Sequence, residues 1–197
     1  MLQRAGFNIT MICRSNADQI RMNGIYIESL WGNSLFKPDQ VLSNAEELNS
    51  NMDLIIVAIK VPLNLDLNYL LGDYSDGRCP ILLIQNGIFI EDVYINMMPK
   101  VHLLSGLAFV CAFRKSFTHI IHLDYGRLDL GLFDNGDSLV ARYICNKLQS
   151  VGVDCRYSSM IQKQRWEKLV WNLPFNPLSV LYQKDTLALL NNDDCRI

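Results

Sequence analysis

The chain has 197 residues; half are hydrophobic, 19% are charged, and 18 basic against 20 acidic residues give a formal net charge of −2. This length and composition exclude the disordered class and predict one sizeable domain, or one domain and part of a second. Because neither charge sign forms a long run, the sequence predicts no nucleic-acid or membrane partner and favours small-molecule chemistry or a protein partner.

The six cysteines are scattered, and none has the C-x-x-C spacing of a zinc or redox pair. Most lie in apolar surroundings such as "TMICR" and "FVCAF", which predicts buried, reduced thiols. His119 and His122 lie three positions apart in a predicted strand, so their side chains point to opposite faces and predict no shared metal ion. The sequence has no signal-peptide pattern and no apolar run long enough to cross a bilayer. We therefore expect a cytoplasmic protein without a metal site.

Short apolar runs recur along the first two thirds of the chain, as buried strands of a mostly parallel sheet do. They are "NITMIC" (8–13), "DLIIVAI" (53–59), "PILLIQ" (80–85) and "HLLSGLAFVCAF" (102–113). Before the second run, "SNAEELNSNM" offers Ser43 or Asn44 as a helix N-cap, followed by two glutamates in the first turn. A short helix leading into a strand indicates a crossover, and the fold class is therefore α/β.

The later part of the chain changes character. "THIIHLDYGRLDLGLFD" predicts two strands with a hairpin at 124–126, and residues 138–150 predict a helix that ends near Gly152. After "VGVDCRYSSM" the pattern becomes continuously helical. We therefore expect a domain boundary near 156–160, which gives one domain over 1–157 and the start of another over 158–197.

The segment "RWEKLVWNLPFNPLSVL" (165–181) places Lys168, Asn172 and Asn176 four residues apart, on one face of a helix. The apolar residues between them are predicted to face the core: Trp166, Leu169, Val170 and Leu173. The spacing alone allows two interpretations. Either the polar stripe faces a ligand cleft, or the lysine reaches solvent and the asparagines satisfy backbone groups at a proline kink.

Four segments, in this order, resemble the ketopantoate reductase (2-dehydropantoate 2-reductase) family: "AGFNITMICR", "DLIIVAIK", "PILLIQNGI" and "WEKLVWNLPFNPLSVL". The resemblance extends over nearly all of the chain. Its most specific features are the strand that ends at Lys60, the "QNG" at 85–87, and the pattern K-x3-N-x3-N-P at 168–177.

The resemblance implies a Rossmann-like, mostly parallel sheet followed by an all-helical domain. Residues 1–157 would then be an incomplete Rossmann-type NADP-binding domain, and residues 158–197 the beginning of the helical domain. The implied activity is the NADPH-dependent reduction of the ketoacid ketopantoate to pantoate, a step of pantothenate and coenzyme A synthesis.

The resemblance also assigns roles in the helix at 165–181. Hydride transfer to a ketone leaves an alkoxide, so the site needs an acid near that oxygen and donors for the rest of the substrate. In this interpretation Lys168 is the proton donor, and Asn172 and Asn176 bind the substrate.

The cofactor contacts implied by the resemblance lie at strand ends. Arg14 follows the "NITMIC" strand, where an arginine suits the 2′-phosphate of NADPH. Lys60 and Asn86 follow two further strands at their carboxyl ends, where open α/β sheets bind ligands, and Asn86 also reaches the substrate. Ala112 corresponds to a small residue near the nicotinamide.

The chain also departs from the family pattern. The family's first strand and Gly-rich phosphate loop would precede "MLQRAGFNIT", and its helical domain would continue well beyond Ile197. We therefore expect "NITMIC" and "DLIIVAI" either to stand apart or to pair directly, and the activity to be impaired by truncation. An inert family remnant or a partner-dependent module is one alternative, and a related 2- or 3-hydroxyacid dehydrogenase is another. Whether the chain forms a homo-oligomer is left open.

Overall fold

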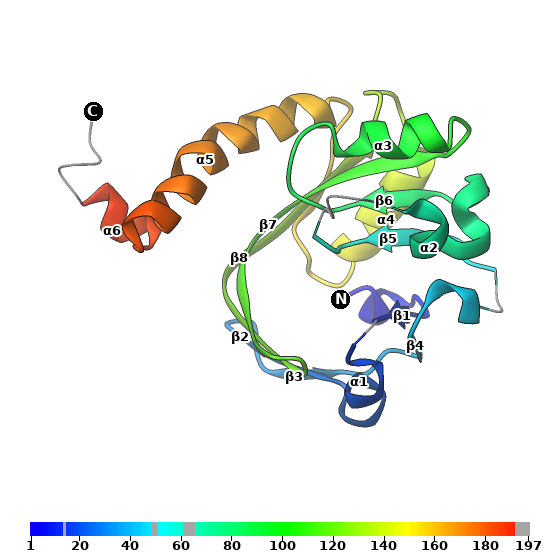
Figure 1. The fold of residues 1–197 in the computed structure, drawn as a ribbon, viewed down its shortest axis with the longest axis horizontal. Helices are drawn as coiled ribbons and strands as arrows, with labels where there is room; N and C mark the ends of the chain where they lie inside the picture. The colour runs from blue at the N-terminus through cyan, green and yellow to red at the C-terminus, as the bar shows by residue number, and fades with distance from the viewer. Residues whose placement is uncertain (14, 49–50, 61–65, 192–197) are drawn as a thin grey trace.

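The computed structural model describes residues 1–13, 15–48, 51–60 and 66–191, which build a mixed α/β fold (Figure 1). The strands are β1 (Thr10–Ile12), β2 (Ile25–Ser29), β3 (Ser34–Phe36), β4 (Gln40–Leu42), β5 (Ile55–Val57), β6 (Ile81–Leu83), β7 (Leu103–Ser116), β8 (His119–Leu132) and β9 (Cys155–Tyr157). The α-helices are α1 (Ala17–Asn23), α2 (Leu67–Leu71), α3 (Ile90–Met97), α4 (Leu139–Gln149), α5 (Ile161–Tyr182) and α6 (Thr186–Leu190). Short 3-10 helices lie at η1 (Gln3–Ala5), η2 (Ala45–Glu47) and η3 (Gly72–Asp76).

Among the described residues, seven strands form the main sheet in the order β3-β2-β8-β7-β6-β5, with β9 paired to β8. The neighbours β5, β6 and β7 run parallel, as do β2 with β8 and β8 with β9, whereas β7 with β8 and β2 with β3 are antiparallel. The mostly parallel, Rossmann-like α/β sheet followed by helices is thereby confirmed.

The core follows the two-residue period of the central strand β6. Ile81 and Leu83 pack into one apolar cluster beneath α3 and η3, whereas Leu82 packs into another beneath α4. Successive side chains of a strand point to opposite faces, so a strand that is apolar at every position requires cover on both sides. The sheet is therefore sandwiched between helices at this end of the molecule.

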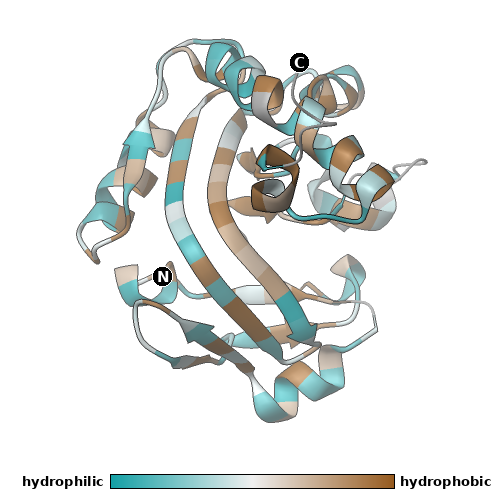
Figure 2. Cartoon of the chain, turned by 90° about the vertical axis from the view of Figure 1, so that its left-hand side faces the viewer, coloured by the Kyte–Doolittle hydropathy of each residue, from teal (hydrophilic) through white to brown (hydrophobic). Residues whose placement is uncertain are grey.

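The two longest strands, β7 and β8, form a curved ribbon (Figure 1). One strand of the ribbon is hydrophobic over most of its length, and the other alternates (Figure 2). The sequence-based hairpin at 124–126 is wrong, because β8 continues through this stretch and the chain reverses between Ser116 and His119 instead. Tyr125 and Gly126 do have positive φ, but at an irregularity inside the strand, where the Trp31 ring occupies the space that a Cβ on Gly126 would need.

The strands at "NITMIC" and "DLIIVAI" stand apart. Within the described residues β1 pairs only with β4, in a parallel two-stranded sheet, and β5 pairs only with β6 at the edge of the main sheet. This arrangement agrees with the first of the two expected outcomes.

Two predicted helices are confirmed, the first together with its predicted N-cap Asn44. The side chain of Asn44 accepts a hydrogen bond from the backbone N–H of Glu47, although η2 is only one turn long. Ser138 caps α4 in the same way, and the helix is followed by Gly152 in the left-handed region. The helices α1, α2 and α3 and the strands β2 to β4 and β9 were not predicted from the sequence.

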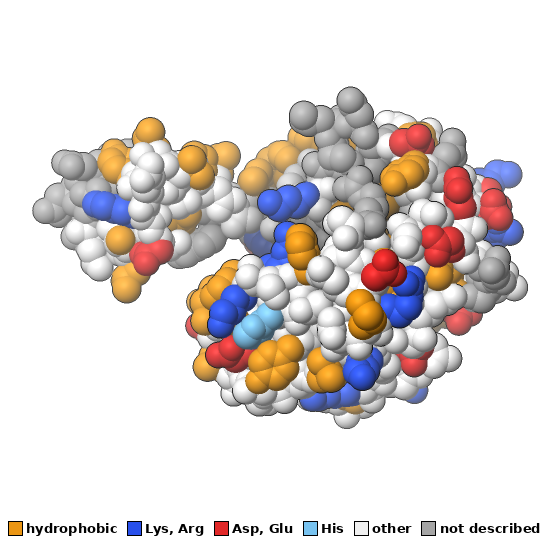
Figure 3. Space-filling model, turned by 60° about the horizontal axis from the view of Figure 1, so that its bottom comes forward, with side chains coloured by type: hydrophobic (Ala, Val, Ile, Leu, Met, Phe, Trp, Pro, Cys, Tyr) orange, Lys and Arg blue, Asp and Glu red, His pale blue; other side chains and the backbone are white. Residues whose placement is uncertain are grey.

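Helix α5 is continuous through Pro174 and Pro177, and its second half with α6 forms a lobe that stands away from the sheet (Figures 1 and 3). The expected core face of this helix is wrong in part, since Trp166, Val170 and Leu173 are exposed. No helix among the described residues is long and apolar enough to cross a membrane. The division into domains near 156–160 stays a prediction.

Candidate active site

A buried ion pair fixes the first turns of α5 to the sheet. Arg165 Nη2 lies 2.8 Å from Glu91 Oε1 of α3, and the two side chains are only 2% and 1% exposed. Ser105 of β7 joins the pair, because its hydroxyl donates to Glu91 Oε1 (2.7 Å) and accepts from Arg165 Nη2 (2.5 Å). The helices α3 and α5 and the strand β7 therefore meet at one guanidinium group.

The same guanidinium holds the turn that follows β6. Arg165 Nη1 donates to the backbone carbonyls of Gln85 and Gly87, each at 3.0 Å. Charge-assisted bonds of this kind are stronger than neutral ones, and the planar guanidinium fixes their directions. Asn86, which lies between the two bound carbonyls, is thereby positioned relative to α5.

Lys168 lies one helical turn after Arg165 and reaches the same turn. Its Nζ donates to Asn86 Oδ1 (3.0 Å) and to the backbone carbonyl of Ala108 on β7 (2.7 Å). The ammonium also lies 5.0 Å from the centre of the Phe109 ring, within cation–π range. These contacts show that Lys168 turns toward the sheet.

Its environment lowers the pKa of Lys168. The main cause is burial, which disfavours the charged form, and the positive charge of Arg165 acts in the same direction. Asp129 on β8 opposes them more weakly. Burial raises the pKa of Asp129 itself, although Arg127 Nε lies 3.2 Å from its Oδ1. Lys168 is consequently a stronger acid than a lysine in water.

A small cleft opens beside this lysine. Its volume is about 10 Å³, and its lining comprises Asn86, Gly87, Leu107, Arg165, Lys168, Leu169 and Asn172. The structure therefore brings three of the sequence-predicted residues together: Asn86, Lys168 and Asn172. A space of this size is about that of one water molecule.

The other predicted residues lie outside the cleft lining. Asn176 is exposed one turn further along α5, Lys60 is exposed after β5, and Ala112 is exposed on β7, four positions beyond Ala108. Arg14 lies outside the described residues. The roles of these four residues stay predictions.

Arg165, Glu91 and Ser105 were not found by sequence reasoning. The available signal was weak: Arg165 lies three positions before Lys168, on the same helix face, and Glu91 lies in the first turn of the helix that follows "QNG". Neither position has a motif that separates it from an ordinary surface charge.

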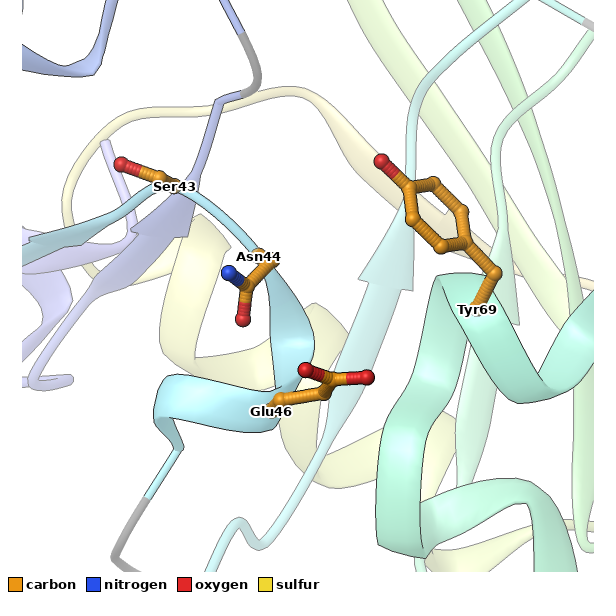
Figure 4. A pocket seen from close by; sticks show the side chains of 4 residues that line it. All are labelled: Ser43, Asn44, Glu46 and Tyr69. Atoms are coloured by element: carbon orange, nitrogen blue, oxygen red, sulfur yellow. The ribbon is translucent and has the colours of Figure 1, made fainter.

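A larger pocket lies elsewhere, between η2 and α2. It measures about 210 Å³, and Glu46 and Tyr69 project into the space between the two elements, beside Ser43 and Asn44 (Figure 4). It shares no lining residue with the cleft at Lys168. Among the described residues, no cluster of His, Cys, Asp and Glu is suited to hold a metal ion. The sequence-predicted residues Asn86, Lys168 and Asn172 line the smaller cleft and not this pocket.

Two family models match the sequence. "Ketopantoate reductase PanE/ApbA" matches residues 1–135, and "Ketopantoate reductase PanE/ApbA C terminal" matches residues 160–197. Among curated proteins, the 2-dehydropantoate 2-reductase of Nostoc sp. is 29% identical over 194 residues, which are 96% of this chain and 60% of that protein.

Solved structures agree with these matches. The 2-dehydropantoate 2-reductases of Methylococcus capsulatus and Geobacter metallireducens superpose with TM-scores of 0.85 and 0.87 at 33% and 30% identity. The alignments cover 98% of this chain and 63% and 64% of those chains. A D-mandelate dehydrogenase with NADH and anilino(oxo)acetate, at 21% identity and a TM-score of 0.83, shares the fold. The chain thus spans less than two thirds of the length of these relatives.

Proposed function

Because the chain belongs to the ketopantoate reductase family, we propose that it serves the NADPH-dependent reduction of ketopantoate to pantoate, with Lys168 as the proton donor. The observation that carries the proposal is the contact of Lys168 Nζ with Asn86 Oδ1 at 3.0 Å. This contact joins two of the three most specific sequence features, "QNG" and the beginning of K-x3-N-x3-N-P, at one cleft.

The chemistry asked of the lysine suits its surroundings. NADPH, when bound, supplies the hydride, and the carbonyl oxygen of the substrate then needs a proton. An ammonium group whose pKa is lowered gives up its proton more readily near neutral pH. Asn172 lies one turn beyond Lys168 and lines the same cleft, which supports its proposed role in binding the substrate. Asn176 extends this polar face outward.

The residues at the strand ends are compatible with the cofactor. Lys60 offers an exposed cation after β5, and Asn86 follows β6, so both are near carboxyl ends of adjacent parallel strands. Asn86 Oδ1 accepts from Lys168, which leaves the amide nitrogen as the donor available to a ligand. We propose both as cofactor contacts, with Ala112 near the nicotinamide and Arg14 at the 2′-phosphate.

The main test compares two lysines of α5. NADPH oxidation is measured with ketopantoate for the wild type, for Lys168→Ala and for Lys163→Ala, which removes an exposed lysine of the same helix. Loss of a positioned proton donor should lower kcat by roughly 10²- to 10⁴-fold. The control should retain the wild-type rate. Full turnover by Lys168→Ala would exclude the lysine as the acid.

Cofactor choice has its own test. A charge-assisted contact to the 2′-phosphate is worth about 1.5 to 3 kcal/mol. Arg14→Ala should therefore weaken NADPH binding by that amount and leave NADH binding unchanged in a fluorescence titration. Equal losses for both cofactors would remove Arg14 from the site.

The alternative of an inert or partner-dependent chain rests on a specific feature. In the described structure β1 and β5 each have a strand neighbour on one side only, and unpaired strand edges are costly. This alternative predicts a poorly stable chain without tight NADPH binding. A cooperative thermal transition above roughly 45 °C, in the range of mesophilic domains, together with micromolar NADPH binding would contradict it.

A further inference from the structure

Two thiols meet where α4 packs against β9. Cys145 is a buried residue of α4, Cys155 is the first residue of β9, and their sulfur atoms lie 3.1 Å apart. Both side chains belong to the apolar cluster between α4 and the sheet. Since sulfur atoms in a disulfide are about 2.0 Å apart, the two need to approach by only about 1 Å to bond.

Hydrogen bonds fix the connection between the two cysteines, which runs from the end of α4 to β9. Gln149 Nε2 donates to the carbonyl of Cys155 (2.6 Å), and the backbone N–H of Val153 donates to the carbonyl of Leu148 (3.1 Å). Cys155 also lies opposite Leu128 in the parallel pairing of β9 with β8. The short distance between the sulfur atoms is therefore set by the surrounding backbone.

The two thiols have different roles in the contact. The Cys155 thiol donates to the sulfur of Cys145. This hydrogen bond lowers the pKa of Cys145, although burial opposes it, and the same contact together with burial raises the pKa of Cys155. Because the thiolate is the reactive form of cysteine, Cys145 is the residue that reacts first.

We propose that Cys145 and Cys155 are a redox pair, which a hydroperoxide oxidises to an intramolecular disulfide. The Cys145 sulfur attacks the peroxide, the O–O bond breaks, an alcohol leaves and a sulfenic acid forms. The Cys155 sulfur then attacks the sulfenic sulfur, the S–O bond breaks and water leaves. In sum, two thiols and one hydroperoxide give one disulfide, one alcohol and one water, and the peroxide is the group that is reduced.

The new bond would tie α4 covalently to the strand at the sheet edge. A cross-link that closes a loop of this length restricts the unfolded chain, so the folded state gains stability. We expect the unfolding midpoint to rise by roughly 5 to 10 °C on oxidation. Access of the peroxide to the buried pair requires local opening of this connection, so oxidation should be slower than that of an exposed thiol.

Peptide mapping tests the pair directly in the 197-residue chain. The Cys111→Ser background removes an exposed thiol. After peroxide treatment, free thiols are alkylated in denaturant and the protein is digested with trypsin, which cuts after Lys147, between the two cysteines. We expect the peptides 143–147 and 148–156 to be joined, lighter than their sum by two hydrogen atoms. Cys145→Ala and Cys155→Ala should each abolish this species.

Cys79→Ala is the matched control, because Cys79 is as buried as Cys145 but its thiol donates to the carbonyl of Met52. This variant should keep the linked peptide and the rise in unfolding midpoint. Recovery of both cysteines as separate alkylated peptides, or their linkage mainly to other cysteines, would overturn the proposal. None of these results depends on reductase activity.

Discussion

The first and last turns of α5 belong to one continuous helix, but only the first turns are fixed to the sheet. At the beginning, Arg165 and Lys168 turn inward and bind Glu91, Ser105 and Asn86. Near the end the side chains point to solvent: Val180 is 78% exposed and Leu181 is 74% exposed.

This contrast reverses the usual distribution of residue types. Charged side chains are seldom fully buried unless they are paired, and a helix generally buries its apolar stripe. In α5 the ion pair is buried, and much of the apolar surface is exposed. The polar anchor therefore determines where the proposed catalytic lysine lies, while the second half of the helix contributes little to that placement.

The largest effect on the contrast between the two halves of α5 is expected when one partner of the Glu91–Arg165 ion pair is removed. Glu91→Gln leaves the Arg165 charge buried without its counter-ion, and losses of about 3 to 5 kcal/mol are typical of such a change. We expect a decrease of this size in the free energy of unfolding, measured by chemical denaturation. The double variant Glu91→Leu/Arg165→Met should recover much of it, because apolar residues of similar volume often replace a buried pair without loss.

The control for this prediction lies on the same helix. Lys163 also forms an ion pair, with Glu167 at 3.8 Å, but both side chains are largely exposed. Lys163→Met should change the free energy of unfolding by less than about 1 kcal/mol. If Glu91→Gln were as mild as Lys163→Met, the ion pair would not be the anchor of α5.

The sequence predicted strands at its longer apolar runs, such as "PILLIQ". The sequence did not distinguish a hairpin turn from an irregularity inside a strand, because both need the same residue types. Asp124, Tyr125 and Gly126 resemble a hairpin turn because a positive φ is typical of turns, yet an irregularity inside a long strand has the same requirement. The actual reversal, between Ser116 and His119, contains no glycine, asparagine or proline to mark it.

The candidate site, like the fold, was predictable only in part. The four-residue spacing of Lys168 and Asn172 placed them on one face, and the structure has both at the cleft. The residues that hold the lysine could not be found in this way, because an arginine and a glutamate far apart in sequence reveal their pairing only in the folded chain. The sequence also could not show which apolar side of α5 is buried. Trp166 and Leu169 are both apolar, but Trp166 is exposed and Leu169 is partly buried.

The protonation of Lys168 should have a smaller effect on the free energy of unfolding. Its pKa is below the usual 10.5, first because of burial and then because of Arg165. As pH rises toward 10.5, the folded state loses this proton before the unfolded chain does, so the unfolded chain binds more protons and the free energy of unfolding rises. The stabilisation is absent at lower pH, where both states are protonated.

Denaturation of the wild type and Lys168→Met between pH 7 and 10 measures this contribution. The wild type should gain stability relative to the variant across the alkaline part of the range. The effect should be smaller than that of Glu91→Gln, since Lys168 is only half-buried and solvent screens it. Parallel pH profiles would show that the first half of α5 does not perturb the lysine.

The smallest change in stability is expected at the far end of the helix. The double variant Val180→Lys/Leu181→Glu replaces two exposed apolar side chains with charged ones, and surface substitutions of this kind usually stay within about 0.5 kcal/mol. Exposed apolar side chains in the same lobe do favour association between molecules (Figure 3). We therefore expect an unchanged denaturation midpoint but less self-association of the double variant in sedimentation velocity at raised protein concentration. A loss of stability comparable to that of Glu91→Gln would mean that this end of α5 is packed against the rest of the chain, and the contrast between the two halves would fail.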